Sequence, residues 1–441
     1  MKIRTHRINA LFNLAGGASA GCMVLFLPYL LNRVLSQADY AIWVLGFQVA
    51  IYVPMFGLGI QQLLNRAIAH HLARDEHEHL HRNLASSLFI LIVLAGAALL
   101  FVFVSAPFVT RITDAQGASN LMIERVWLKV GGAASLGLFS LFFFGCFGGQ
   151  QRYEWENIYK AIISVGFIAL IICTLGFGLT ITPTLLANLY IVSIGCGLLF
   201  LIWRYAMQRE LPVLRLRDWH MPTVKSYLRG MYGLSVWQIG VLMFSGLDLW
   251  IVAKIDFAAV PGYAIALSFL AFVNGAVAAL AGPCLPRFAA ELSKSECGIF
   301  KSIFIPFQSR VLLLLSGLFA CIILCPSALW TFLLRESAPS FNLVFPILLL
   351  ATCLRLVTLL YSLAVIAANV QHRIILSPLV EGVVNLTSSV ILAYWFGAIG
   401  VAIGTLLGAI ACVLFTALHN MRRTAEEVPL TALNMLNPWK I

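Results

Sequence analysis

The chain has 441 residues, of which 61% are hydrophobic and only 11% are charged, and its mean hydropathy is +0.93. Soluble domains carry roughly 25% charged residues, so this composition excludes a soluble globular protein and predicts one that uses lipid as its solvent. The net charge of +11 does not indicate a nucleic-acid partner, because the basic residues are concentrated in short loops between apolar runs.

Twelve apolar runs are long enough to cross the hydrocarbon core of a bilayer, which needs about 20 residues of helix. The first six runs cover residues 11–31, 41–64, 84–109, 126–146, 158–177 and 181–201. The second six cover residues 230–253, 262–281, 311–333, 341–364, 374–394 and 397–418. The sequence therefore predicts an all-α polytopic membrane protein with twelve transmembrane helices.

The longest polar linker divides these helices into two sets of six. We expect an N-terminal six-helix bundle, a basic cytoplasmic linker, a C-terminal six-helix bundle and a cytoplasmic tail, at residues 1–205, 206–225, 226–420 and 421–441. The halves look related, because Tyr40-Ala41-Ile42 opens the second helix and Tyr263-Ala264-Ile265 opens the eighth. Six helices is an even number, so both halves would insert in the same orientation around a central cavity.

The positions of lysine and arginine predict how the chain is oriented in the membrane. If the N-terminus is cytoplasmic, most of the 29 basic residues and all nine histidines fall on the cytoplasmic side. This asymmetry predicts that both termini are cytoplasmic. No cleavable signal peptide is expected, because the first apolar run lacks a small-residue cleavage site.

Polar stripes lie within four of the predicted helices, where an ionisable group costs about 2.5–3.5 kcal/mol on insertion scales. Residues three or four apart share one helical face, so each set forms a stripe. The stripes are Gln48, Tyr52, Gly59, Gln62 and Arg66 in the second helix, Gln238, Ser245 and Asp248 in the seventh, Thr352, Arg355, Thr358 and Ser362 in the tenth, and Glu381, Asn385 and Ser388 in the eleventh. Four such stripes are most easily placed around one water-filled cavity.

These residues supply two kinds of candidate functional group. The candidates for contact with a substrate are Arg355, Arg66, Gln48, Lys129, Thr352 and Asn385. The candidates for coupling to an ion gradient are Asp248 and Glu381. The alternative is that the buried polar residues pair with one another and only hold helices together, and that Lys129 extends its ammonium group to the membrane interface.

A histidine-rich segment at residues 70–81 contains His70, His71, His77, His79 and His81. A metal site is one interpretation, but no ligand set is fixed by the spacing. We favour a solvated amphipathic helix on the inner surface, and we expect neither a resident metal ion nor a cofactor.

Three glycines recur every four residues in the last predicted helix, at Gly400, Gly404 and Gly408. This spacing places them on one face, where the missing side chains let another helix approach closely. The ridge therefore predicts a close helix–helix contact along residues 397–418.

Several short motifs resemble those of one known family. They are Tyr40-Ala41-Ile42-Trp43 with Gly57-Leu58-Gly59-Ile60, Gly148-Gly149-Gln150-Gln151-Arg152 with Asn157, Asp248-Leu249-Trp250-Ile251-Val252 with Gly262-Tyr263, Pro286-Arg287-Phe288-Ala289, and Glu381 and Asn385 with Phe396-Gly397, Gly400-Val401-Ala402 and Gly404-Thr405. In these motifs the chain resembles the polysaccharide (O-antigen, Wzx-type) flippases of the MOP superfamily, the multidrug/oligosaccharidyl-lipid/polysaccharide exporters. The resemblance covers most of the chain.

The resemblance implies a transporter and not an enzyme. Its substrate would be a polyprenyl-diphosphate-linked oligosaccharide repeat unit, moved from the cytoplasmic to the outer leaflet of a bacterial inner membrane by alternating access. The product would serve O-antigen (lipopolysaccharide), capsule or exopolysaccharide biosynthesis. Arg355 would face the diphosphate, which needs a cationic partner outside water. The partners implied are this lipid-linked substrate, membrane lipid, a polysaccharide polymerase and a chain-length regulator, with no nucleic acid.

Three other functions stay open. A multidrug cation antiporter of the same superfamily typically carries an acidic residue in its first helix, and residues 11–31 contain none. A peptidoglycan-precursor flippase usually has fourteen helices, against the twelve predicted. A membrane-embedded polymerase or ligase typically has a large outer loop, whereas the longest predicted outer segment is residues 110–125.

Overall fold

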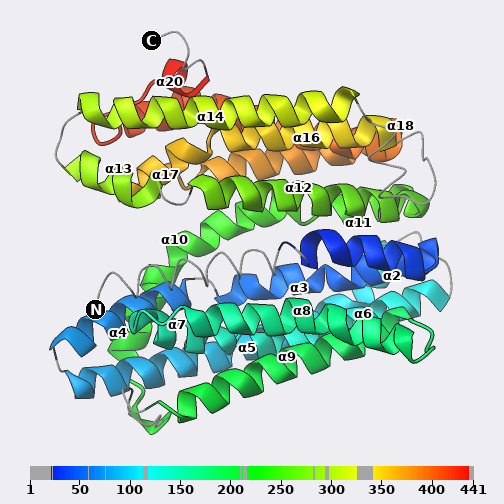
Figure 1. Ribbon diagram of the computed structural model, residues 1–441, viewed down its shortest axis with the longest axis horizontal. Coiled ribbons are helices and arrows are strands. Elements are labelled where there is room, and N and C mark those ends of the chain that lie inside the picture. Colours follow the sequence, from blue (N-terminus) through cyan, green and yellow to red (C-terminus); the bar gives the residue numbers. More distant parts are fainter. Residues whose placement is uncertain are drawn as a thin grey trace. The chain divides into compact units, whose positions relative to one another are not determined.

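The computed structural model describes residues 21, 23–57, 59–74, 76–112, 118–208, 211, 216–281, 284–293, 297–324, 341–368 and 370–436. All regular elements within these residues are helices, which confirms the predicted all-α class (Figure 1). Nine helical stretches in this part of the chain are long and apolar enough to cross a membrane. They are Gln37–Leu72, Glu78–Arg111, Ser119–Gly149, Glu154–Gly176, Pro183–Ala206, Phe257–Ala278, Phe300–Ala320, Leu343–Ala367 and His372–Arg423.

The nine stretches are compatible with twelve predicted helices for three reasons. The stretch His372–Arg423 contains two helices that the chain joins at a kink. The first predicted helix, residues 11–31, is described only in part, as the shorter apolar helix Met23–Val34, and residues 11–20 and 22 lie outside the described residues. The seventh corresponds to two consecutive helices, α10 (Met221–Ser245) and α11 (Asp248–Ile255). The later part of the ninth predicted helix, residues 325–333, lies outside the described residues.

The chain forms two compact units, Met1–Ser235 and Val236–Ile441, called here the N unit and the C unit. The N unit contains α2 (Gln37–Phe47), α3 (Val49–Tyr52), η1 (Val53–Gly57), α4 (Ile60–Arg74), α5 (His77–Ile112), α6 (Ala118–Gly137), α7 (Ser140–Gly149), α8 (Glu154–Gly176), α9 (Pro183–Ala206), η2 (Leu216–Asp218) and the first part of α10. The C unit contains the rest of α10, α11, η3 (Phe257–Ala259), α12 (Val260–Ala281), α13 (Cys284–Ser293), α14 (Cys297–Leu324), α16 (Phe341–Val357), α17 (Leu359–Ala367), η4 (Gln371–Ile374), α18 (Ser377–Phe415), η5 (Thr416–Asn420), α19 (Met421–Arg423) and α20 (Ala432–Leu436).

The second predicted helix is broken in the structure. It begins with a cap in which the Ser36 hydroxyl oxygen accepts a hydrogen bond from the backbone amide of Asp39 at 3.1 Å. The α-helix is then interrupted at Gln48 and becomes a 3₁₀ helix at η1, which contains Pro54. Proline has no backbone N–H to continue an α-helical hydrogen-bond ladder. Gly59 follows with a φ of 79°, a conformation that favours glycine.

Glycines on α7 let α4 pack closely in the N unit. A Cβ atom added to Gly145 would lie 2.8 Å from Leu64 Cδ2, and one added to Gly149 would lie 2.7 Å from Ile68 Cβ. Contacts this short do not occur between real side chains, so a larger residue at either position would push α4 and α7 apart.

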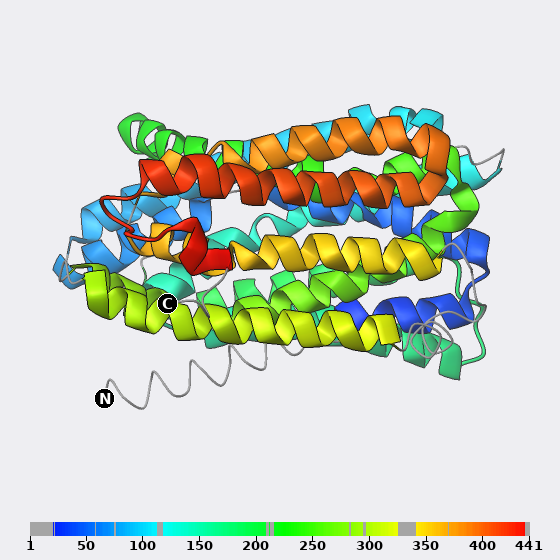
Figure 2. The same ribbon diagram turned by 90° about the horizontal axis from the view of Figure 1, so that it is seen from above.

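Helix α18 is a hairpin of two arms joined at Gly397, whose φ of 58° and ψ of −137° are not helical. Figure 2 shows the two arms, in orange and red, side by side. A Cβ atom on Gly404 would lie 2.5 Å from Ser389 Cα, and one on Gly408 would lie 2.8 Å from Asn385 Cβ. The glycine ridge therefore lies against the first arm, which confirms the predicted close helix contact.

The outward faces of the spans are apolar, as a lipid-facing surface requires. Leu100 in α5, Leu199 in α9 and Leu313 in α14 are each more than half exposed. Tyr394 and Trp395 are 77% and 75% exposed next to the Gly397 kink. Exposed aromatic residues at a helix end are typical of the membrane–water interface.

The C-terminal segment packs against other helices of the C unit. Gln308 is fully buried in α14, and its Nε2 donates hydrogen bonds of 2.9 Å to the carbonyl oxygens of Val357 and Met435. Arg373 forms a two-point ion pair with Glu427, with nitrogen–oxygen distances of 2.8 and 3.0 Å. The predicted tail is thus ordered as far as residue 436, and residues 437–441 lie outside the described part.

Candidate functional site

Arg355 and Glu381 form a buried ion pair within the C unit. Arg355 lies in the last turn of α16, and its Nε donates to Oε1 of Glu381 in the first arm of α18. The two side chains are 19% and 5% exposed. A charge in such surroundings is tolerated only with a partner, because desolvation is not otherwise compensated. The structure therefore brings together one residue predicted to contact substrate and one predicted to couple to an ion.

Thr352 lies one turn before Arg355 and is buried. Its hydroxyl donates to the carbonyl oxygen of Leu348 at 3.0 Å, a bond within its own helix. Thr358 similarly donates to the carbonyl oxygen of Arg355 at 2.8 Å. Ser362 donates to the carbonyl oxygen of Thr358 at 3.1 Å. All three hydroxyls of this stripe thus bond to a preceding turn, whereas the Arg355 side chain reaches another helix.

A second group of polar atoms surrounds Asp248, which is 1% exposed at the start of α11. Its Oδ2 accepts a hydrogen bond of 2.9 Å from the hydroxyl of Thr405 in the second arm of α18. Thr405 and Ser389 both direct their hydroxyls to the carbonyl oxygen of Val401, at 3.1 and 3.2 Å. Ser389 also lies 2.7 Å from Oδ1 of Asn385.

These contacts define an oxygen cluster of five groups: the Asp248 carboxylate, the Thr405 and Ser389 hydroxyls, the Asn385 carbonyl and the Val401 backbone carbonyl. Its side chains come from α11 and from both arms of α18. The glycine ridge brings the two arms close together, so the Ser389 hydroxyl of the first arm reaches the Val401 carbonyl of the second. An all-oxygen set around one carboxylate is chemically suited to a hard monovalent cation or a proton.

The electrostatic surroundings link the cluster to the ion pair. Asp248 interacts electrostatically with the positive charge of Arg355. The side chain of Tyr263, which is fully buried, interacts electrostatically with Asp248 and forms a hydrogen bond with Thr405. The Asn385 side chain also forms a hydrogen bond with Asp248, so residues of both arms of α18 hold this carboxylate. The side chains of Gln238 and Ser245, the other members of its predicted stripe, lie outside the described part.

The structure does not join the three candidates of the N unit. Gln48 is buried at the break between α2 and α3, Arg66 is exposed on α4, and Lys129 of α6 donates to Oδ1 of Asn188 at 2.8 Å. In the described part of the chain, no hydrogen bond or ion pair connects these three side chains to one another. Their contact with a substrate stays a prediction.

Sequence reasoning missed two side chains of the oxygen cluster, those of Ser389 and Thr405. It placed Ser388 on the polar stripe of the eleventh helix, but that hydroxyl bonds to backbone carbonyls, including that of Val384 at 2.5 Å. Ser389, four residues after Asn385, is the serine in the cluster. Two features of the sequence could have indicated these residues. Ser389 is four residues after Asn385, and Thr405 directly follows Gly404 of the glycine ridge.

Glu156 is a further polar residue that the sequence did not single out. Its side chain is 15% exposed in α8 and accepts from Lys160 Nζ at 2.7 Å and from Gln61 Nε2 at 3.2 Å. The first contact is an ordinary i,i+4 pair of the kind found on solvated helices. The second joins α8 to α4, which local spacing cannot show.

Comparison with solved structures identifies the fold. An inward-facing multidrug-resistance MATE-family transporter of the MOP superfamily superposes with a TM-score of 0.75 at 17% identity, covering 95% of both chains. The lipid II flippase MurJ in an inward closed conformation gives 0.70 at 16% identity, covering 97% of this chain and 90% of its own. A MOP-superfamily transporter from Pyrococcus furiosus gives 0.61 at 17% identity, covering 96% and 94%.

No protein-family model matches the sequence, and no curated protein matches it at a significant level. The structural similarity nevertheless extends over nearly the whole length of each compared chain. The chain is a multi-pass membrane protein with the fold of the MOP-superfamily transporters. The compared proteins include both a multidrug transporter and a lipid-linked-precursor flippase, and none of the three is described as an enzyme.

Proposed function

We propose that this protein is a flippase for polyprenyl-diphosphate-linked oligosaccharides in a bacterial inner membrane. It would move the repeat unit to the outer leaflet by alternating access, for O-antigen, capsule or exopolysaccharide biosynthesis. The observation that carries the proposal is the partly buried cation Arg355, whose side chain is 19% exposed and is held by Glu381. A diphosphate that leaves water needs a charged donor of this kind, and guanidinium groups bind such oxygens at two points.

The ion pair suggests how substrate binding exchanges partners. A diphosphate carries more negative charge than one carboxylate, so its arrival at Arg355 competes with Glu381. Glu381 is 5% exposed, and an unpaired charge at that depth is costly. We therefore infer that the substrate and Glu381 compete for Arg355, and that the ion pair forms again when the substrate leaves.

The oxygen cluster is proposed as the ion-coupling site, with Na⁺ as the ion its donors suit best. A cation beside Asp248 would cancel a negative charge that interacts with Arg355. Occupancy of the cluster would thereby change the affinity of Arg355 for an anion, and substrate would change the affinity for the cation by the same factor. Asp248 and Asn385 would both act here, so Asn385 would serve the ion rather than the sugar.

The membrane potential supplies a second driving force. An inside-negative potential favours outward movement of an anionic head group by about 2.3 kcal/mol per charge per 100 mV. The polyprenyl chain can stay in lipid during this movement, so the transport path has to accommodate only the diphosphate and the sugars.

A cation antiporter is the second candidate, and two observations favour it. The MATE-family structure gives a higher TM-score than MurJ, 0.75 against 0.70, and both Asp248 and Glu381 are buried carboxylates that could bind a cationic drug. Against it, Glu381 is already paired with Arg355, and the first predicted helix carries no acidic residue.

A strain that lacks this gene but keeps its glycosyltransferases and polymerase separates the two functions. The flippase proposal predicts that lipid-linked repeat units accumulate in the cytoplasmic leaflet, that surface polysaccharide is lost, and that the intact gene restores export. Unchanged surface polysaccharide together with increased sensitivity to cationic drugs would contradict the proposal and favour the antiporter.

A further inference from the structure

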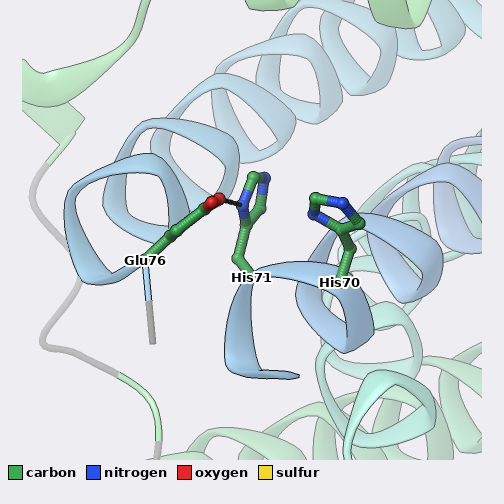
Figure 3. Close-up of side chains that lie close together, drawn as sticks. All are labelled: His70, His71 and Glu76. Atoms are coloured by element: carbon green, nitrogen blue, oxygen red, sulfur yellow. Dashed lines mark hydrogen bonds and ion pairs between the residues drawn. The ribbon is translucent and has the colours of Figure 1, made fainter. Parts of the chain in front are cut away.

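Three side chains of the kind that bind metal ions lie close together at the turn between α4 and α5 in the N unit. His70 and His71 come from the last turns of α4, and Glu76 precedes α5. One ligand atom from each residue lies within 4.8 Å of the other two. Figure 3 shows the His71 ring between the Glu76 carboxylate and the His70 ring.

The turn is held in shape by contacts that do not involve a metal. The backbone amide of Glu76 donates to the carbonyl oxygen of His71 at 3.0 Å, and Leu80 is buried beneath it. The exposed His79 ring stacks on His71, with ring centroids 5.6 Å apart. The three ligand side chains are therefore positioned by the fold, which lowers the entropy cost of gathering them around an ion.

The hydrogen bonds around His71 assign its tautomer. The Asn83 Oδ1 atom accepts from the Tyr227 hydroxyl at 3.2 Å, and Asn83 Nδ2 donates to the His79 carbonyl oxygen at 2.8 Å. This orientation directs an Nδ2 hydrogen to Nε2 of His71 at 3.1 Å, so Nε2 accepts. Nδ1 then carries the proton and donates to Glu76 Oε2 at 2.7 Å. A proton in this position, between an imidazole nitrogen and a carboxylate oxygen, can be exchanged for a metal ion.

We propose that His70, His71 and Glu76 bind one divalent transition-metal ion, with Zn²⁺ as the best match. Imidazole nitrogen and carboxylate oxygen together suit zinc better than magnesium or calcium, which take oxygen ligands. The ion replaces the proton on His71 Nδ1, and that proton leaves to water. A water molecule or the neighbouring His79 completes four-coordination.

The movements needed to form the site are small. Zinc–ligand bonds of about 2.0–2.2 Å place tetrahedral ligand atoms about 3.4 Å apart. The His71–Glu76 contact of 2.7 Å therefore opens by about 0.7 Å. Separations of up to 4.8 Å within the group must shorten by about 1.4 Å, which rotation of the exposed His70 side chain can supply.

The proposed site is an alternative to the sequence-based interpretation of this segment as a solvated amphipathic helix. The five histidines within residues 70–81 lie on two helices, α4 and α5, so their spacing along the sequence does not follow the period of one helix. The chain reverses direction between these helices, and this reversal brings Glu76 next to His71. The site does not depend on the proposed transport function.

The test uses the full-length protein without an affinity tag, purified in detergent and freed of metal. Titration with Zn²⁺ by calorimetry should give binding of about one equivalent, and Co²⁺ should give the intense visible bands of tetrahedral coordination. Removing a residue that only hydrogen-bonds to a metal ligand lowers metal affinity about 10- to 100-fold. Removing a ligand itself should cost at least as much, so His70→Ala and Glu76→Gln should each lower the affinity at least about tenfold. Both side chains reach the surface, so these variants should fold.

The matched control is the triple variant His77→Ala/His79→Ala/His81→Ala, which removes more imidazoles but none of the three ligands. It should keep binding within about tenfold of the wild type, since His79 is replaceable by water. Wild-type affinity in His70→Ala and Glu76→Gln, together with loss of binding in the triple variant, would overturn the proposal. So would the absence of a Zn²⁺ or Co²⁺ signal from the wild-type protein.

Discussion

Replacement of Arg355 by methionine tests whether the buried ion pair is more than a structural link. In the Arg355→Met variant the Glu381 carboxylate, 5% exposed, loses the partner that compensates its burial. Breaking a buried pair by removing one partner typically costs about 3–5 kcal/mol, and the near-complete burial of Glu381 places this variant in that range. The converse variant, Glu381→Gln, leaves a guanidinium that is less deeply buried, at 19% exposed, so its cost should be smaller.

The double variant Arg355→Met/Glu381→Met separates stability from transport. Replacing a whole buried pair by apolar residues of similar volume is often neutral or stabilising, so the double variant should regain most of the stability lost in Arg355→Met. Transport should stay absent, because the cation for the diphosphate is gone. The assays are reversible unfolding in detergent for stability and restoration of surface polysaccharide for transport.

Two results would refute this reasoning. Wild-type stability of Arg355→Met would show that the pair is not energetically coupled. Restored export in the double variant would show that Arg355 only holds α16 against α18, which is the structural alternative that the sequence left open.

Three further predictions follow from the described contacts. Gly404→Ala should lower the unfolding free energy of the C unit by about 1–3 kcal/mol, because the added Cβ has no room in the α18 hairpin. Gly195→Ala is the control: it has open space around it and should not lower the stability measured in the same unfolding assay. Thr405→Val, which removes the hydrogen bond to Asp248 at nearly constant volume, should weaken the Na⁺ dependence of transport, measured as initial rate against Na⁺ concentration; an unchanged Na⁺ dependence would contradict the ion site. The hydrogen bond from its histidine partner lowers the pKa of Glu76 below its ordinary value of 4.5. The contact between Glu76 and His71 therefore stabilises the protein above pH 4.5, and this stabilisation is lost as the pH falls through the lowered pKa of Glu76. The difference in unfolding free energy between the wild type and Glu76→Gln in metal-free buffer should vanish in acid.

The sequence predicted the helices because their signal is local. An apolar run of about 20 residues has few alternatives to a spanning helix, since the backbone must satisfy its own hydrogen bonds in lipid. The glycine ridge was also predictable, because spacing by four residues fixes a common face on a helix. The break of the second span at Gln48 was not, because only Pro54 and Gly59 mark it and both lie later in the chain.

The partners of the polar residues were beyond local reasoning. Arg355 and Glu381 lie on different helices, and a helical stripe shows which face is polar but not what that face meets. Hydroxyl groups are the least predictable, because serine and threonine in helices often bond to their own preceding turn. Ser388 does so and also reaches the Gly404 carbonyl across the hairpin. Ser389 reaches the Val401 carbonyl in the other arm, and Thr405 reaches Asp248 in α11, so only the packed structure shows which hydroxyl meets the carboxylate.

The most direct test of the proposed function is a leaflet assay with the purified protein in proteoliposomes. A polyprenyl-diphosphate oligosaccharide is placed in both leaflets, and the fraction open to a membrane-impermeant glycan-oxidising reagent is followed with time. The proposal predicts that this fraction rises beyond that of the outer leaflet with the wild-type protein and not with the stability-matched Arg355→Met/Glu381→Met variant. Equal exposure with and without the wild-type protein, in vesicles where the protein is folded, would contradict the central claim that this chain flips a diphosphate-linked glycan.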